Sequence, residues 1–345
     1  MAALTGGATP VEGRLRRQGL AGGTLALIAL AALVGASLLH VGFGAKFVSP
    51  STALDALFRF DATNFDHLII TRLRIPRLLA ALAVGAALGL AGATIQAVTR
   101  NPLAGPGILG MNAGAALAVV VATSFGGAVA GVSTPWIAAA GAVAVFAIVM
   151  GLSSAGRAGP TPFKMVLAGV AVSAFAGSIT SAILMFDVAT LDSVRLWLAG
   201  NLGGPRLEAL RHAAIPMAAG ALLALATAPQ LNAMALGEAA ATGLGVRVRR
   251  ARIACLLATA LLAGAAVSAV GPIGFIGLVV PHMVKLFVPT ENRLILPLSA
   301  VVGALVLVLA DLAARVVLAP QEIATGIMTA LLGAPIFVIL VRRRL

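Results

Sequence analysis

The chain is poor in charged residues, aromatic residues and cysteine. Only 10% of its 345 residues are charged and 4% are aromatic, tyrosine is absent, and Cys255 is the single cysteine. A lone cysteine excludes an internal disulfide framework and a cysteine-based metal cluster, so we expect Cys255 to fill apolar space. Soluble domains usually carry about 25% charged residues, so this scarcity of charge excludes an ordinary soluble fold.

Apolar residues take the place of the missing charge. They make up 60% of the chain, and the mean hydropathy is +1.07. A bilayer core of roughly 30 Å accommodates about 20 helical residues. Runs of suitable length, bounded by charge, proline or glycine, cover 19–41, 70–98, 106–126, 135–156, 163–186, 206–228, 249–270, 273–289, 296–318 and 323–341. The sequence therefore predicts an all-α membrane protein with ten transmembrane helices, in which a tail of residues 1–18 precedes one polytopic domain over 19–345.

Basic residues orient the predicted spans. The formal net charge is +13, and a cytoplasmic N-terminus places most basic residues at the inner ends of the spans, as the positive-inside rule requires. An even number of spans then puts both termini in the cytoplasm. Arg72, Arg74 and Arg77 fall on the outer side and need another explanation. The basic residues form short clusters that suit lipid headgroups, without long basic runs or interleaved aromatics, so nucleic-acid binding is excluded.

The sequence contains no recognisable catalytic set. Its loops are too short for a soluble domain, its four histidines are scattered, and the phosphate-binding pattern Gly-x-x-x-x-Gly-Lys-[Ser/Thr] is absent. We therefore expect a chain that is not an enzyme, holds no metal and does not bind ATP itself. Asp311 lies four residues before Arg315 in an apolar span, either as a structural pair or as a proton relay. The sequence shows no intramembrane histidine or second carboxylate beside Asp311, which argues against an ion-coupled carrier.

Glycines and prolines mark expected helix contacts and breaks. Gly85 and Gly89 form a small-xxx-small pair that Gly92 continues, so we expect close backbone packing in the second span. The run from Gly271 to Gly277 contains Pro272 and three glycines at three-residue spacing. It predicts a break between the seventh and eighth spans, and broken helices of transporters often border the pathway.

Several motifs carry a family resemblance. They are Arg74-Ile75-Pro76-Arg77, Gln96, the run from Arg100 to Gly110, and the stretches 197–204, 231–245, 271–282 and 324–335. Together, over about residues 68–343, they resemble the FecCD/BtuC-type permeases. The resemblance implies a BtuC-like fold and the permease subunit of a type II ABC importer for iron-siderophore complexes, haem or cobalamin, in the bacterial cytoplasmic (inner) membrane.

The resemblance also implies roles for residues at the outer ends of the spans. In the family, arginines at the positions of Arg74, Arg77 and Arg315 pair with acidic residues of an extracytoplasmic substrate-binding protein. Arginine suits this role because its planar guanidinium engages carboxylates bidentately. The alternative is that these side chains reach towards lipid phosphates.

On the cytoplasmic side, the resemblance implies a coupling segment and a gate. Residues 229–248 are expected to form two short helices, broken at Gly237 and at 243–245, that dock into an ABC ATPase subunit. The coupling residues are Leu236, Gly237, Glu238, Ala240, Leu244 and Gly245. The gate would combine Asn101, Pro102 and Leu103 with Thr161 in the loop between the fourth and fifth spans. Plain connections and turns are the alternatives for both segments.

The fifth span supplies the expected pathway lining. One of its faces carries Val166, Val170, Ser173, Gly177 and Thr180 at three- and four-residue steps. By the resemblance, this face meets its counterpart in a second permease subunit, and ordinary helix packing is the alternative.

These inferences combine into one functional hypothesis. The chain is expected to import a ferric siderophore as one of two permease subunits, in a homodimer or a paralogous heterodimer. Two ATPase subunits would bind the ATP and Mg²⁺, so this chain would hold no cofactor, and a binding protein would deliver the substrate. Cobalamin or haem is the alternative substrate. A proton-coupled secondary transporter with Asp311 as the coupling acid is the alternative mechanism, and a membrane-embedded enzyme is a third.

Overall fold

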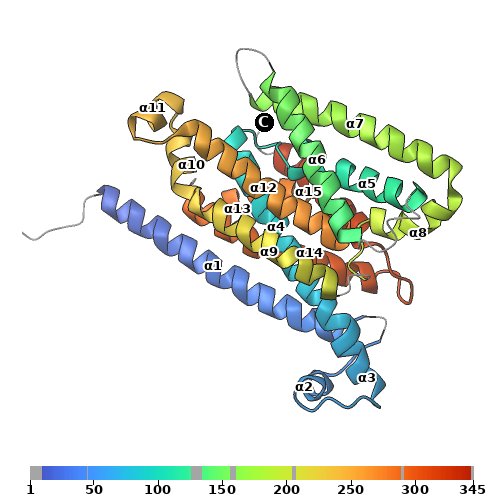
Figure 1. Cartoon of the computed structure of the whole chain (residues 1–345). Helices are drawn as coiled ribbons and strands as arrows, with labels where there is room; N and C mark the ends of the chain where they lie inside the picture. The colour runs from blue at the N-terminus through green and yellow to red at the C-terminus, as the bar shows by residue number, and fades with distance from the viewer. Residues whose placement is uncertain are drawn as a thin grey trace, which may run out of the picture.

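The computed structural model describes residues 10–44, 46–125, 134–155, 161–203, 207–288 and 291–342 (Figure 1). Within these ranges the chain is helical and contains no strand. The elements are α1 (Pro10–Gly42), α2 (Pro50–Phe58), α3 (Phe65–Leu68), the π-helical turn η1 (Ile69–Arg74), α4 (Ile75–Thr99), the 3₁₀ turn η2 (Pro106–Leu109), α5 (Met111–Phe125), α6 (Thr134–Ser154), α7 (Pro162–Phe186), α8 (Val188–Leu198), α9 (Leu207–Ala226), α10 (Ala228–Ala235), α11 (Glu238–Gly243), α12 (Val248–Val270), α13 (Ile276–Phe287), α14 (Asn292–Val316) and α15 (Thr325–Arg342).

Ten of these elements correspond to the predicted spans. In the described residues, seven helices are long and apolar enough to cross a membrane, and three shorter apolar helices lie at Met111–Phe125, Ile276–Phe287 and Thr325–Ile339. The first helix begins at Pro10, inside the tail predicted over residues 1–18, although its apolar span starts only at Gly23. The all-helical membrane architecture is therefore confirmed, and the number of crossings stays a prediction.

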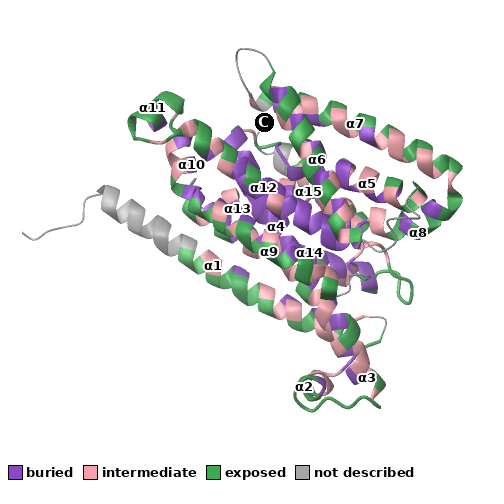
Figure 2. Cartoon of the chain, in the orientation of Figure 1, coloured by how far each residue is buried: buried purple, intermediate pink, exposed green. Residues whose placement is uncertain are grey.

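The core is built around α4 and α12. In their most apolar windows 72% and 78% of residues are buried, whereas only 17% are buried in α1 and in α7. Helix α4 packs against α14, α12 and α13, and α12 also packs against α9 and α6. Figures 1 and 2 show α1 and α7 on opposite flanks, with the buried residues concentrated between them. Cys255 lies buried in this core, as predicted.

Glycine allows α4 to approach two neighbours at backbone distance. A Cβ atom added at Gly92 would overlap the carbonyl oxygen of Gly277 in α13, and one at Gly89 would overlap the carbonyl oxygen of Ser299 in α14. Close contact between small residues is the main source of helix association in lipid, where the hydrophobic effect contributes little. The expected close packing of the second span is thereby confirmed.

A Gly92→Val variant tests this contact. The added side chain has no space without moving α13, so we expect destabilisation of about 1–3 kcal/mol or more in denaturant unfolding in micelles. The control is Gly35→Ala in α1, where an added Cβ has nothing within 4 Å, and we expect it to lose no stability. Equal stability of the two variants would contradict the packing described for α4.

The predicted break after the seventh span is also present. Helix α12 ends at Val270, α13 begins at Ile276, and Gly271 and Phe275 between them have φ values of 81° and 67°. A Cβ atom at Gly271 would overlap the carbonyl oxygen of Trp197, so this position tolerates only glycine. The break thus lets the segment after α8 pack against the end of α12.

Candidate functional site

A buried ionic cluster lies at one end of the bundle, which we call the α8 end because it carries α2, α3, α8 and the connection 317–324. At its centre the Asp311 carboxylate of α14 accepts two hydrogen bonds from Arg77 of α4. They join Nε to Oδ2 at 2.8 Å and Nη2 to Oδ1 at 3.0 Å. This is the bidentate geometry in which a guanidinium and a carboxylate interact most strongly.

Two further helices complete this cluster around Asp311. His40 of α1 lies with Nε2 at 2.9 Å from Oδ2, and Thr325 of α15 donates to Oδ1 at 2.6 Å. Arg315 lies one turn beyond, with Nε at 3.5 Å from Oδ2, and donates through Nη2 to the carbonyl oxygen of His40 at 3.0 Å. Because an unpaired charge is costly in a low-dielectric interior, these contacts hold α1, α4, α14 and α15 together.

The three arginines predicted to dock a binding protein are all turned inwards. Arg74, Arg77 and Arg315 are only 5%, 8% and 3% exposed. Arg74 lies apart from Asp311 and donates to the backbone carbonyls of residues 41, 42 and 46. Arg77 also donates through Nη1 to Oε2 of Glu322 at 2.7 Å. The side chain of Glu322 is 43% exposed. The docking role of the arginines stays a prediction.

Sequence reasoning found only part of this cluster. The expected Asp311–Arg315 pair is present, but the expectation that no intramembrane histidine lies beside Asp311 was wrong, because His40 contacts it. Arg77 is a further partner that the sequence did not predict. These partners are separated from Asp311 by 271 and 234 positions. No local spacing rule connects residues so far apart, so only the helix arrangement brings them together.

Asp187 links two helix ends at the same end of the bundle. It is the N-cap of α8, and its carboxylate accepts hydrogen bonds from the Ser124 hydroxyl at 2.6 Å and from the backbone N–H and the hydroxyl of Thr190. These bonds favour the charged form and lower the pKa of Asp187 to about 2. The contact joins the end of α5 to the start of α8.

This depressed pKa predicts a response to acid. The stabilisation by ionised Asp187 is fully present above the ordinary aspartate pKa near 3.8 and is lost as the pH falls towards about 2. An Asp187→Asn variant keeps a side-chain oxygen that can cap α8 but has no carboxyl group to protonate. We therefore expect its stability to fall less steeply than that of the wild type between pH 4 and pH 2. The exposed Asp192 provides the control, and Asp192→Asn should keep the wild-type slope. Identical slopes for all three proteins would contradict this role.

The opposite end of the bundle, the α11 end, carries the predicted coupling residues. Two short helices form as expected, α10 and α11, separated at Gly237 with φ 115°. Leu236 and Leu244 are 71% and 65% exposed, and Glu238, Ala240 and Gly245 are also exposed. Glu238 accepts a hydrogen bond from Arg252 at 2.6 Å, which fastens α11 to α12. Exposed leucines in a cytoplasmic or extracytoplasmic segment typically mark a contact surface.

The predicted gate residues also lie at the α11 end of their helices. After α4 ends at Thr99, the Asn101 side chain accepts a hydrogen bond from the backbone N–H of Leu103 at 2.9 Å, and Pro102 and Leu103 are exposed. Thr161 caps the start of α7 by accepting from the backbone N–H of Lys164 at 3.3 Å. Residues 156–160 of the same loop lie outside the described residues. Gate function stays a prediction for all four residues.

The predicted pathway face lies along α7. Val170 is 56% exposed, and Val166, Ser173, Gly177 and Thr180 are half-buried. The buried residues of α7, Met165, Gly169 and Ala176, lie on the adjacent face. The predicted lining therefore runs beside the packed face and is partly free of contacts within the chain.

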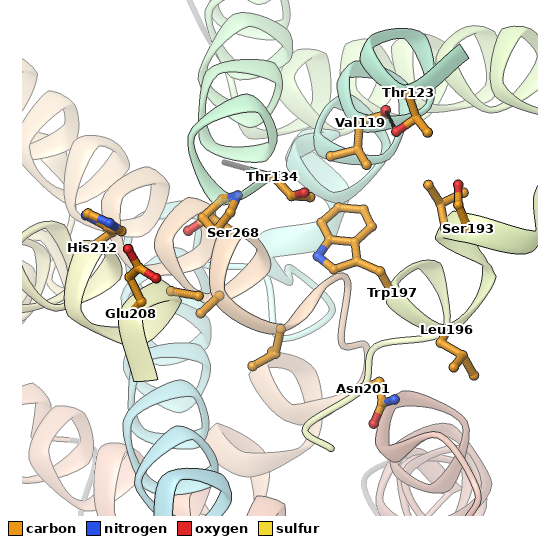
Figure 3. A pocket seen from close by; sticks show the side chains of 15 residues that line it. Val119, Thr123, Thr134, Ser193, Leu196, Trp197, Asn201, Glu208, His212 and Ser268 are labelled. Atoms are coloured by element: carbon orange, nitrogen blue, oxygen red, sulfur yellow. Dashed lines mark hydrogen bonds between the residues drawn. The ribbon is translucent and has the colours of Figure 1, made fainter. Parts of the chain in front are cut away.

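A separate cavity opens at the α8 end among α5, α6, α8, α9 and α12. Its volume is about 690 Å³. Figure 3 shows Trp197 projecting into it, with Glu208 and His212 on the α9 side and Thr123 and Ser193 opposite. Trp197 belongs to one of the resemblance motifs, but sequence reasoning assigned no cavity to it. Among the described residues, no group of three histidine, cysteine or acidic side chains could hold a metal ion.

These features define a helical membrane protein with a buried ionic cluster at one end and exposed leucines at the other, and comparisons with known proteins identify its class. The chain belongs to the FecCD transport family, whose sequence model matches residues 29–343. It is 40% identical to the probable siderophore transport system permease protein YfiZ of Bacillus subtilis over 88% of this chain and 91% of that protein. It is 39% identical to the ferric enterobactin transport system permease protein FepD of Escherichia coli over 90% of this chain and 93% of that protein.

Other relatives carry different substrates in their names. The vitamin B12 import permease BtuC of Vibrio vulnificus is 38% identical over 90% of this chain and 92% of its own length. A solved structure, described as an inward-facing conformation of a metal-chelate type ABC transporter, matches with a TM-score of 0.80 and 27% identity. That match covers 93% of this chain and 99% of the solved one. The chain is thus a permease of the metal-chelate class of ABC importers.

Proposed function

We propose that this permease carries a ferric siderophore inwards across the cytoplasmic membrane. The family match and the siderophore permeases among the relatives support this substrate. The supporting observation on this chain is its architecture, in which a buried helical core around α4 and α12 connects the α8 end to the α11 end. Because the family comprises permease subunits of ABC importers, we assign the supply of energy to separate ATPase subunits.

The membrane topology belongs to this proposal. We place ten helices across the bilayer, with both termini and the α11 end in the cytoplasm and the α8 end outside. Arg247, Arg249 and Arg250 at the start of α12 then lie on the inner side, as the positive-inside rule favours.

The α11 end is the proposed docking site for two ATPase subunits, one for each permease. Leu236 and Leu244 provide the exposed apolar contact, and Glu238 holds α11 against α12, so motion of the docked ATPase would reach the spans. Asn101, Pro102, Leu103 and Thr161 are the proposed cytoplasmic gate.

A second permease subunit is the proposed partner of α7. Only 17% of the most apolar window of α7 is buried within the chain, so most of its surface is open to a neighbour or to lipid. Val166, Val170, Ser173, Gly177 and Thr180 would line the pathway between the two copies or paralogues. Such a small, weakly polar lining suits passage of a bulky chelate without tight binding.

The α8 end is the proposed docking surface for the extracytoplasmic binding protein. We propose Arg74, Arg77 and Arg315 as the docking residues of this surface, although all three are buried in this conformation. Arg77 positions the partly exposed Glu322, and Arg74 holds the chain at residues 41–46.

Substrate uptake tests the proposal against its alternatives. Membrane vesicles that contain this chain, its ATPase and its binding protein are supplied with a ferric siderophore, cobalamin or haem at equal concentration. We expect accumulation of the siderophore and little of the other two. If only cobalamin or only haem accumulated, that compound would be the substrate in place of the siderophore, and the chain would still be an importer permease. The family match favours the ABC importer over the proton-coupled alternative.

A further inference from the structure

Helix α2 carries its bulky apolar side chains on the outside. Its inward face consists of Ala53 and the buried Ala56, which pack with Val48 and Ile70 in a small separate core. Leu54, Leu57 and Phe58 project outwards and are 56%, 55% and 84% exposed. A helix covering a protein core in water shows the reverse distribution, with large apolar residues inside and polar residues outside.

The apolar surface extends beyond α2 into the flanking segments. The neighbouring side chains Phe43, Phe47, Phe60, Phe65 and Leu73 are all exposed. Phe43 and Phe47 pack edge to face with ring centroids 5.2 Å apart. Together with Leu54, Leu57 and Phe58 they form a surface that we call the α2 patch. Helix α2 contacts α1, α3 and η1, so these exposed side chains are carried by neighbouring segments. Apolar side chains gathered in this way mark an interaction site with protein or membrane.

The α2 patch adjoins the exposed end of α1, which is one of the proposed membrane spans. Leu38 and Leu39 in the last turns of α1 are 70% and 49% exposed, and Phe43 and Phe47 follow directly in the chain. In Figure 1, α2 lies beside the end of α1, on the flank away from α7. A second permease subunit bound along α7 would therefore leave the α2 patch uncovered.

The charged side chains around the α2 patch lie at its edge, and their positive and negative charges nearly cancel. Ser51 and Asp55 occupy the edge of α2 next to Phe58, and Arg59 follows at its C-terminal end. Lys46 and Asp66 neutralise each other in an ion pair of 2.6 Å. An apolar stripe with a charged rim and little net charge suits the headgroup boundary of a membrane, whereas an acidic or basic protein partner would be matched by charge of one sign.

From these observations we infer that the α2 patch is a membrane-surface anchor that lies in the outer leaflet of the bilayer. Leu54, Leu57 and Phe58 enter the acyl boundary, while Asp55 and Ser51 face the aqueous side. The anchor holds the connection between α1 and α4 at a fixed depth. The end of α1 and this connection supply the backbone carbonyls of residues 41, 42 and 46 that bind Arg74, so the anchor also steadies the turn η1 that leads into α4.

Site-directed spin labelling tests this anchor. Cys255 is fully buried, and a Cys255→Ala background leaves one introduced cysteine for labelling. Labels are placed at Phe58→Cys and Leu57→Cys, with Asp55→Cys as the matched control in the same helix. The assembled permease is reconstituted into phosphatidylethanolamine and phosphatidylglycerol vesicles. We expect the ratio of oxygen to nickel-chelate collisions to be several-fold higher at positions 57 and 58 than at position 55.

Three results would overturn the inference. Nickel-chelate access at positions 57 and 58 as high as at position 55, with no excess of oxygen collisions, would show that the patch faces water. Dipolar broadening at position 58 would show that a second copy covers it. Burial that arises only after addition of the binding protein would make the patch a protein-docking surface. All labelled positions are exposed on the chain, so correct assembly of each variant can be verified by its bound ATPase before measurement.

Discussion

Replacing Asp311 by asparagine is expected to destabilise the protein by about 3–5 kcal/mol. The change removes the one carboxylate among the described residues that contacts both Arg77 and Arg315, and it leaves two buried guanidinium groups with reduced compensation. The loss is measured by denaturant unfolding of the purified chain in micelles, and by the amount of protein that accumulates in the membrane.

Glu322 provides the matched control for Asp311. It pairs with the same Arg77 at 2.7 Å, but its side chain is 43% exposed, so Glu322→Gln should cost only about 0–1 kcal/mol. The double variant Asp311→Asn with Arg77→Met also removes the guanidinium group of Arg77. It should recover part of the lost stability, because only one of the two buried cations, Arg315, then remains without its carboxylate. If Asp311→Asn cost no more than Glu322→Gln, the cluster would not hold the four helices together.

Aspartate at Leu236 and Leu244 is expected to reduce ATP-driven transport about tenfold or more. Both side chains are exposed at the α11 end and make few contacts within the chain, so the substitutions should leave its folding unchanged. They place charge in the proposed apolar contact with the ATPase, where loss of a central anchor typically costs 2 kcal/mol or more. Transport and co-purification of the ATPase are measured on the same preparations.

Two outcomes separate a docking role from a general defect. Leu236→Met keeps apolar contact and should retain ATPase binding and transport. Full transport by the aspartate double variant would show that α10 and α11 are a plain connection. Loss of transport with an unchanged amount of bound ATPase would show that the leucines act in transmission of motion and not in docking.

The positions of the long helices and of two helix breaks could be predicted from the sequence, because apolar runs and glycine patterns determine them. A run of about 20 apolar residues has few alternatives to a helix in lipid, so the positions of the long helices followed from the apolar runs along the chain. Pro272 and the three glycines of the run from Gly271 to Gly277 predicted the break between α12 and α13 from local sequence, whereas the positive φ of Phe275 was not predicted. The two short helices around Gly237 were predicted on the same basis.

Features that depend on the arrangement of helices were not predictable in this way. The contact of His40 with Asp311 joins the first helix to the last third of the chain. The burial of Arg74 likewise depends on a chain segment folding back over its guanidinium group. Helices α2 and α8 were missed because each is short and lies in a connection where no span-length pattern exists. Their positions follow from packing against the ends of longer helices.

ATP-dependent uptake of radiolabelled iron chelate by proteoliposomes is the most direct test of the account. The vesicles contain this chain with its ATPase subunits inside and its binding protein outside. We predict that ferric siderophore accumulates only when ATP is present inside, and that dissipation of the proton gradient has no effect. Uptake without an ATPase, driven by a proton gradient, would contradict the assignment of this chain as the permease of an ABC importer.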